Sequence, residues 1–279
     1  MKIGIAFPNT IPGASGRLQT EWAVRAEERG FSTVSATHRL RYPGHEPLPV
    51  LAAAAAVTSR IGLSTNILVA PLTTAEVLAK EAATVASLAE GRLVLGLGPG
   101  VRADDFEAAD RDFGRRAQVF DGQLAELARL RGKEGAGILP GPVPPVLVGG
   151  LSANAVRRAA RWADGWTAPG LEPELVAPTV RQVEEEWAAV GREGRPRLVA
   201  LSRYWLGADV AEEAAGFVRD YFGVLGDEAE SFVEKTPRSP GRIREQIAEL
   251  AAAGFDEIVF HPTAARLSQV DRLADAVLS

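Results

Sequence analysis

Residues 61–97 read IGLSTNILVAPLTTAEVLAKEAATVASLAEGRLVLGL, and their pattern indicates the fold of the chain. The two ends of this stretch, residues 61–69 and 92–97, are short apolar runs typical of buried strands. Between them, residues 73–76 have the spacing of a helix capping box. Gly91 stands where helices commonly end. The stretch therefore predicts a strand, a helix that runs to about Ala89, and a second strand.

The rest of the chain repeats this unit. We expect strands at residues 2–7, 31–36, 61–69, 92–97, 145–148, 165–168, 197–206 and 256–260. We expect helices at residues 21–29 (capped by Thr20), 51–59, 104–131, 172–190, 210–222, 240–253 and 263–278, and one that starts at Ser152. The 279 residues divided by eight give about 35 per unit, enough for crossovers between parallel strands. The sequence predicts a single-domain (β/α)8 barrel over residues 1–279.

An open, doubly wound sheet is the main alternative to the barrel. A dinucleotide-binding sheet of that kind carries a Gly-x-Gly-x-x-Gly fingerprint after its first strand. Residues 8–13 read PNTIPG instead. The barrel is therefore the better interpretation.

Composition excludes several classes of function. The net charge of -5 gives no basic footprint, so we expect no nucleic-acid partner. The chain has no cysteine, which removes disulfides, thiolate metal sites and a cysteine nucleophile. No apolar run is long enough for a signal peptide or a membrane span. We expect a cytoplasmic protein without a membrane partner.

The residues that follow each strand should line the active face, because barrel enzymes carry their sites at the carboxyl ends of the strands. These positions are Pro8 and Asn9, His38, Asn66, residues 98–100, Gly149 and Gly150, Trp166 and Thr167, Arg203 and Tyr204, and His261. They hold few carboxylates and histidines, so we expect no metal centre and no glycosidase pair. An organic cofactor that acts on a small organic substrate fits this inventory better.

Two glycine-rich turns suggest where that cofactor binds. Gly149 and Gly150 come just before a helix that starts at Ser152, and a helix N-terminus favours phosphate. A tight turn alone also explains such a pair. Gly98-Pro99-Gly100 leaves room at the rim for a flat group. The alternative there is a simple loop that needs positive φ.

Six segments resemble the luciferase-like monooxygenase superfamily, which includes bacterial luciferase and F420-dependent reductases. They are residues 58–68, 79–84, 90–98, 144–150, 159–166 and 253–257. The resemblance implies a barrel with a flavin or deazaflavin ring across the strand ends, and a non-prolyl cis bond at Asn66–Ile67. The cofactor-binding residues it implies are Asn66, Ile67, Gly98, Pro99, Gly100, Gly149, Gly150, Leu151 and Ser152.

The same resemblance implies a catalytic role for His38, near the reactive face of the ring. A histidine can donate or accept a proton near neutral pH. The alternative is a histidine that only anchors its loop. Relatives usually carry aspartate before this histidine, but here the residue is Thr37. We expect His261 to be structural and His45 to be exposed.

The sequence leaves three functions open. The first is an oxidoreductase or monooxygenase that uses reduced flavin (FMN). The second is an F420-dependent enzyme that transfers hydride, and the third is a flavin-binding relative without catalysis. Relatives are frequently dimers, which leaves a homodimer open. Residues 132–144 read as a connection, and residues 223–236 as an active-site cover or a plain surface helix pair.

Overall fold

Eight parallel strands close into a barrel in the computed structural model, which describes residues 1–131 and 137–278. The strands follow one another around the barrel in chain order, and β1 closes it by pairing with β8. They are β1 (Lys2–Ala6), β2 (Thr33–Ala36), β3 (Gly62–Val69), β4 (Leu93–Gly98), β5 (Val146–Gly149), β6 (Gly165–Thr167), β7 (Arg197–Tyr204) and β8 (Glu257–Pro262). The predicted (β/α)8 barrel is confirmed.

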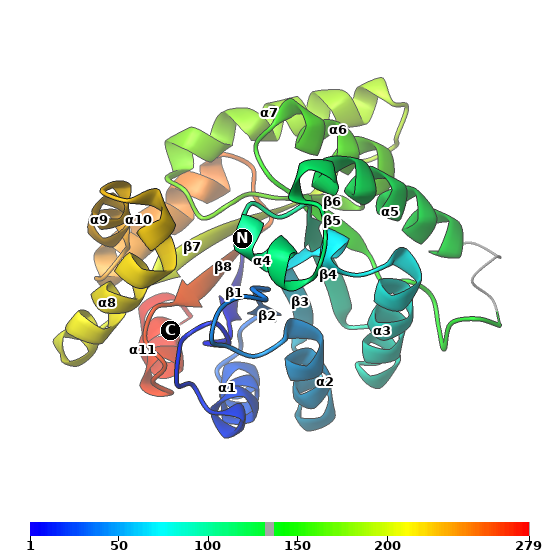
Figure 1. Cartoon of the computed structure of the whole chain (residues 1–279). Coiled ribbons are helices and arrows are strands. Elements are labelled where there is room, and N and C mark those ends of the chain that lie inside the picture. Colours follow the sequence, from blue (N-terminus) through cyan, green and yellow to red (C-terminus); the bar gives the residue numbers. More distant parts are fainter. Residues whose placement is uncertain (132–136, 279) are drawn as a thin grey trace.

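Helices surround this barrel and cover the outer face of its strands (Figure 1). They are α1 (Gly16–Glu28), α2 (Pro47–Val57), α3 (Ala75–Leu88), α4 (Ala103–Ala108), α5 (Arg116–Arg131), α6 (Ala153–Trp162), α7 (Pro173–Ala189), α8 (Ala211–Phe222), α9 (Glu228–Lys235), α10 (Pro240–Ala252) and α11 (Ser268–Val277). Their inward faces and the strands form one large apolar core. Within the described part of the chain, none of these helices is long and apolar enough to cross a membrane.

Helices α1, α2 and α3 begin at other residues than the sequence predicts, as does α11, which begins at Ser268. Helix α1 begins earlier, because Ser15 caps it by accepting from Leu18 N–H, whereas Thr20 bonds back to Arg17. Helix α2 also begins earlier, at a proline, which is well tolerated in a first turn. Helix α3 is capped by Thr74, whose Oγ1 accepts from Val77 N–H, so Thr73 and Glu76 do not form the expected capping box.

The predicted helix at residues 104–131 is two helices with a break. Asp110 has a φ of 53°, a left-handed conformation that ends α4. Asp112 then accepts from Gly114 N–H and starts a short 3-10 turn that leads into α5. Part of the connection predicted at residues 132–144 lies outside the described residues.

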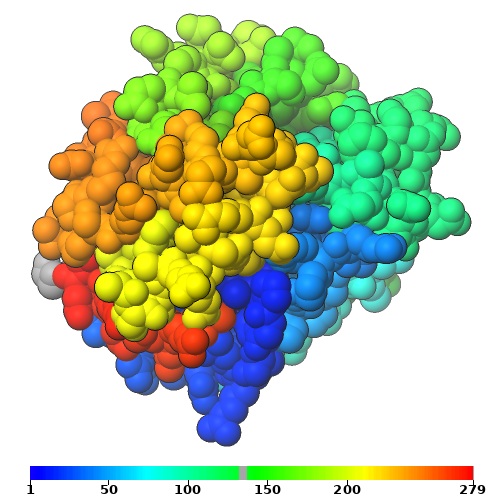
Figure 2. All heavy atoms as spheres, turned by 60° about the vertical axis from the view of Figure 1, so that its left-hand side comes forward, coloured from blue at the N-terminus to red at the C-terminus, as the bar shows by residue number. Residues whose placement is uncertain are grey.

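Helices α8 and α9 form a pair that lies at the rim of the barrel, in the connection from β7 to α10 (Figure 1). The pair has a small apolar core of its own, built around Trp205, Val218 and Phe222. In Figure 2 its yellow and gold atoms lie beside the blue N-terminal part of the chain. The Tyr42 hydroxyl donates to the Asp220 carboxylate and holds the two parts together.

Candidate active site

A cavity of about 630 Å³ lies at the carboxyl ends of the strands. Binding pockets for small molecules and cofactors usually measure roughly 300–1,000 Å³, so this volume suits an organic cofactor with a substrate. All ten predicted site residues line it: His38, Asn66, Ile67, Gly98, Pro99, Gly100, Gly149, Gly150, Leu151 and Ser152. The structure therefore brings the predicted residues together, although their roles stay predictions.

The Asn66–Ile67 peptide bond is cis, as the resemblance implied. The ladder between β3 and β4 shifts register at this point, between Thr65 and Leu68. Asn66 is only 3% exposed, and its Oδ1 accepts a hydrogen bond of 3.2 Å from the Thr167 hydroxyl. Its main-chain oxygen accepts one of 3.1 Å from the Thr37 hydroxyl. Residues from β2, β3 and β6 thus fix this segment of the cavity wall.

Glycines make room for the side chain of Ile67. A Cβ atom on Gly98 would lie 2.8 Å from Ile67 Cδ1, and one on Gly149 would lie 3.0 Å from Ile67 Cγ2. A Cβ atom on Gly96 would lie 2.2 Å from the main-chain oxygen of Thr65. The glycine pattern noticed in the sequence therefore lets the β3 segment pack closely against β4 and β5, and leaves a smooth apolar surface around Ile67.

The N-terminus of α6 opens into the same cavity. Ser152 caps this helix, and its Oγ accepts a hydrogen bond of 3.2 Å from Ala155 N–H. Gly150 has a φ of 119°, which side chains rarely adopt. The indole of Trp166 donates to the Gly150 main-chain oxygen over 2.7 Å and fixes the turn. The turn and the helix dipole together form a site suited to a phosphate group.

The cavity wall carries far more positive than negative charge. Its charged residues are Arg39, Arg102, Arg116, Arg158, Arg203 and Asp105, besides its histidines. Arg39 is paired with Asp105 at 2.9 Å, and Arg158 with Asp121 at 2.5 Å. The other three arginines form no ion pair with any residue that the structure describes.

Main-chain oxygens hold these three guanidinium groups instead. Arg102 donates to Tyr221 O over 2.6 Å, and Arg116 donates to Gly100 O over 3.2 Å. Arg203 donates to Gly170 O, also over 3.2 Å. None of the three had a role predicted from the sequence. Arg203 stands at the end of a predicted strand, which was the one sequence feature that pointed to the cavity. Arg102 precedes α4 and Arg116 begins α5, positions that a search of the strand ends does not cover.

His38 is held on both sides of its ring. Its Nδ1 accepts a hydrogen bond of 3.2 Å from Val69 N–H, and its Nε2 lies 3.4 Å from the Glu46 carboxylate. The main-chain N–H of His38 donates to the main-chain oxygen of Ile67. These contacts favour the loop-anchoring alternative, because proton transfer at Nδ1 requires loss of the bond to Val69. The catalytic role of His38 stays a prediction.

His261 lines the same cavity from β8 and is the partner of Arg203 in the β7–β8 register. Burial, with a smaller contribution from the Arg203 charge, lowers the pKa of His261 to about 3. Its Nδ1 lies 3.4 Å from Thr37 Oγ1, and its Nε2 is buried with no partner among the described residues. The ring is therefore neutral near pH 7. His45, expected to be exposed, is partly buried, and Asn9 links its main chain to that of Thr37.

Helix α8 closes one side of the cavity with Phe217, Tyr221 and Phe222. Arg39 and Arg102 lie over the ring of Tyr221, at 5.6 and 5.7 Å from its centroid. Residues 223–236 were expected to form either an active-site cover or a plain surface helix pair; the side chains that cover the cavity come from the preceding helix, α8. Within residues 1–131 and 137–278, no three His, Asp or Glu side chains gather where they could hold a metal ion.

The family model of luciferase-like monooxygenases matches residues 1–254. The chain belongs to this family. It is 31% identical over 210 residues to an uncharacterized protein of Mycobacterium tuberculosis (strain ATCC 25618 / H37Rv), which covers 68% of this chain and 74% of that protein.

Two further comparisons are with proteins whose names include F420. The chain is 27% identical over 290 residues to the F420-dependent glucose-6-phosphate dehydrogenase of Nakamurella multipartita, which covers 86% of this chain and 84% of that one. The structure of an F420-dependent secondary alcohol dehydrogenase, in complex with an F420–acetone adduct, superposes with a TM-score of 0.83 at 15% identity. That superposition covers 100% of this chain and 99% of the other. At this identity, the likeness supports the fold alone.

Proposed function

We propose that this luciferase-like protein is an F420-dependent oxidoreductase that acts on a small organic substrate. The observation that carries the proposal is the unpaired positive charge at the cavity. FMN ends in a single phosphate, whereas F420 carries a phosphodiester followed by several glutamyl carboxylates. Arg102 and Arg116, which form no ion pair among the described residues, line the same cavity as the phosphate site at the N-terminus of α6 and add two guanidinium groups to its wall. A long anionic tail uses this charge better than one phosphate does.

The residues present fit such a cofactor. Ile67, flanked by Gly98 and Gly149, offers an apolar surface for a flat ring. Gly150 and Ser152 would hold the phosphodiester at the start of α6. When bound, F420 supplies hydride transfer, and the chain's own residues orient the partners and exclude water. Helix α8 serves that exclusion, because its aromatic side chains cover the cavity.

A monooxygenase that uses reduced FMN is the second candidate. The family description and the apolar wall of the cavity, which would keep water from a reactive intermediate, favour it. The two candidates share the site but differ in the number of negative charges that the protein must bind. Binding measurements therefore separate them.

An anaerobic titration tests the proposal. Purified full-length protein is titrated with F420 and, separately, with FMN, each in its oxidised and reduced form, and binding is followed by fluorescence. We expect F420 to bind at least tenfold more tightly than FMN. Tighter binding of reduced FMN would overturn the proposal in favour of the second candidate. Binding of neither cofactor would reject both.

A further inference from the structure

A second, smaller pocket adjoins the cavity and shares three residues with it: Gly170, Ser202 and Arg203. We name it the β7 recess. It has a volume of about 70 Å³ and lies between β7, the start of α7, and α9. A cavity needs roughly 10–15 Å³ of this volume to hold one water molecule, so the recess has room for a carboxylate or a phosphate group.

Arg203 forms the wall between the β7 recess and the cavity. Its guanidinium donates to Gly170 O over 3.2 Å and lies 4.3 Å from the ring centroid of Phe222. A Cβ atom on Gly170 would lie 3.1 Å from Arg203 Nη1, so glycine at this position makes room for the group. Burial lowers the pKa of Arg203, but arginine stays charged in proteins. The result is a partly buried cation with no counter-ion among the described residues, an arrangement that is costly unless an anion binds.

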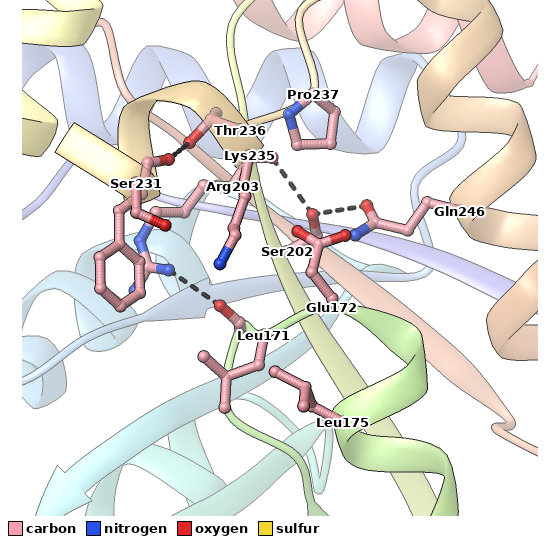
Figure 3. A pocket seen from close by; sticks show the side chains of 12 residues that line it. Leu171, Glu172, Leu175, Ser202, Arg203, Ser231, Lys235, Thr236, Pro237 and Gln246 are labelled. Atoms are coloured by element: carbon pink, nitrogen blue, oxygen red, sulfur yellow. Dashed lines mark hydrogen bonds between the residues drawn. The ribbon is translucent and has the colours of Figure 1, made fainter. Parts of the chain in front are cut away.

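A second cationic side chain also lines the β7 recess. Lys235, in the last turn of α9, points into the β7 recess beside Arg203 (Figure 3). It forms no ion pair in the part of the chain that the structure describes. The carboxylate that lines the recess, Glu172, is paired with Arg242 at 3.3 Å. The recess therefore has a net positive charge that no carboxylate in residues 1–131 or 137–278 neutralises.

The opposite side of Arg203 is apolar. Phe217 and Phe222 of α8 line the cavity there, together with Phe7 and Leu201. This half of the cavity lies at β7 and β8, away from the glycine-rich wall at β3 to β5 that would hold the cofactor ring. A molecule bound in this half of the cavity would therefore place its apolar part against α8 and a polar end group at Arg203.

We infer that the β7 recess is the substrate's anion subsite: Arg203 and Lys235 bind a carboxylate or phosphate group at the end of an apolar substrate. The inference rests on the proposed function only in calling this molecule the substrate. The guanidinium of Arg203 matches the two oxygens of such a group, and the ammonium of Lys235 adds a point charge. Arg203 is thus a specificity-determining residue, distinct from Arg102 and Arg116, the arginines proposed to bind the cofactor.

Calorimetry with three probes tests the inference on the full chain, with and without F420. The probes are 3-phenylpropanoate, 2-phenylethyl phosphate and the neutral 3-phenylpropan-1-ol. We expect at least one anion to bind tenfold or more tightly than the alcohol, and the better anion identifies the group. Arg203→Met should bring the ratio close to one, Arg203→Lys should keep part of it, and Lys235→Met should reduce it several-fold. Arg157→Met, on the exposed face of α6, is the matched control and should change nothing.

Each outcome decides the inference. Equal affinities for anion and alcohol in the wild type, or an unchanged preference in folded Arg203→Met, would overturn it. If Arg203→Met does not fold, Arg203→Lys and Lys235→Met provide the same comparison. Loss of F420 affinity in Lys235→Met would also contradict it, because the recess would then serve the cofactor. An anion preference that depends on Arg203, in a protein that binds neither F420 nor FMN, would reject the proposed function and keep the subsite.

Discussion

The Thr37 hydroxyl donates a hydrogen bond of 3.1 Å to the main-chain oxygen of Asn66, the residue before the cis bond. The family resemblance implies aspartate at this position, and an ionised carboxylate cannot donate. Threonine therefore gives this chain a direct link between the end of β2 and the wall at β3. The same Oγ1 lies 3.4 Å from Nδ1 of His261.

Replacing Thr37 tests this link. Thr37→Val removes the donor and leaves the Asn66 oxygen without its bond, so we expect the free energy of unfolding to fall by about 1 kcal/mol. Thr37→Ser keeps the hydroxyl and should lie close to the wild type. Urea unfolding of the three proteins measures the difference. Equal stability of the Val and Ser variants would show that the bond contributes nothing.

Replacing Arg116 tests whether the cavity binds the anionic tail of F420. Arg116→Met should raise the dissociation constant of F420 about tenfold, because a charge-assisted contact is worth about 1.5–3 kcal/mol. The remaining affinity should depend less on salt than in the wild type, because one charge is lost. The matched control is Arg181→Met, on the exposed face of α7. An equal effect of both substitutions would mean that only net charge matters.

The role of His38 can be separated into anchoring and proton transfer. His38→Asn keeps an acceptor for the Val69 N–H, whereas His38→Ala removes it. From the contacts of the ring, we expect turnover within about threefold of the wild type for Asn and a tenfold or greater loss for Ala. Steady-state kinetics measures the turnover of both variants, once a substrate of the enzyme has been identified. A tenfold loss in both variants, with cofactor affinity unchanged, would instead support the catalytic role.

His261 makes stability depend on pH. Its pKa falls from 6.5 in the unfolded chain to about 3 in the folded protein, so the unfolded state binds the extra proton. Stability is therefore fully present above pH 6.5 and is lost as the pH falls toward 3. Between pH 7 and pH 5 this loss is about 2 kcal/mol, at 1.36 kcal/mol per unit. His261→Asn should remove it.

Urea unfolding of the wild type and His261→Asn at pH 7 and pH 5 provides the measurement. The other titrating groups are shared by the two proteins, so the difference between them isolates His261. Parallel pH dependence in both proteins would show that the ring is protonated in the folded state or reached by solvent.

The barrel could be predicted from the sequence because strand–helix alternation is a local pattern. The glycine turns at residues 98–100 and 149–150 were equally visible, since they are contiguous. Helix ends were less certain: Ser15 and Thr20 are both good caps, and only the packing of α1 decides between them. Asp110 interrupts the predicted helix at residues 104–131 because it adopts a left-handed conformation, which its residue type alone does not predict.

The positively charged residues of the cavity and the β7 recess could not be predicted from the sequence. Arg102 and Tyr221 are 119 residues apart, and they meet only because α8 folds over the rim. Lys235 and Arg203 likewise share the β7 recess through the packing of α9 on β7. Thirty-one lysines and arginines are spread along the chain, and only the structure shows which of them lack a carboxylate partner.

A crystal structure of the protein with F420 would show where the cofactor binds. We expect the deazaflavin ring against Ile67 and Gly98, the phosphodiester at the N-terminus of α6, and the glutamyl tail directed toward Arg102 and Arg116. Density for F420 at another place, or none at a concentration that saturates binding, would contradict this placement.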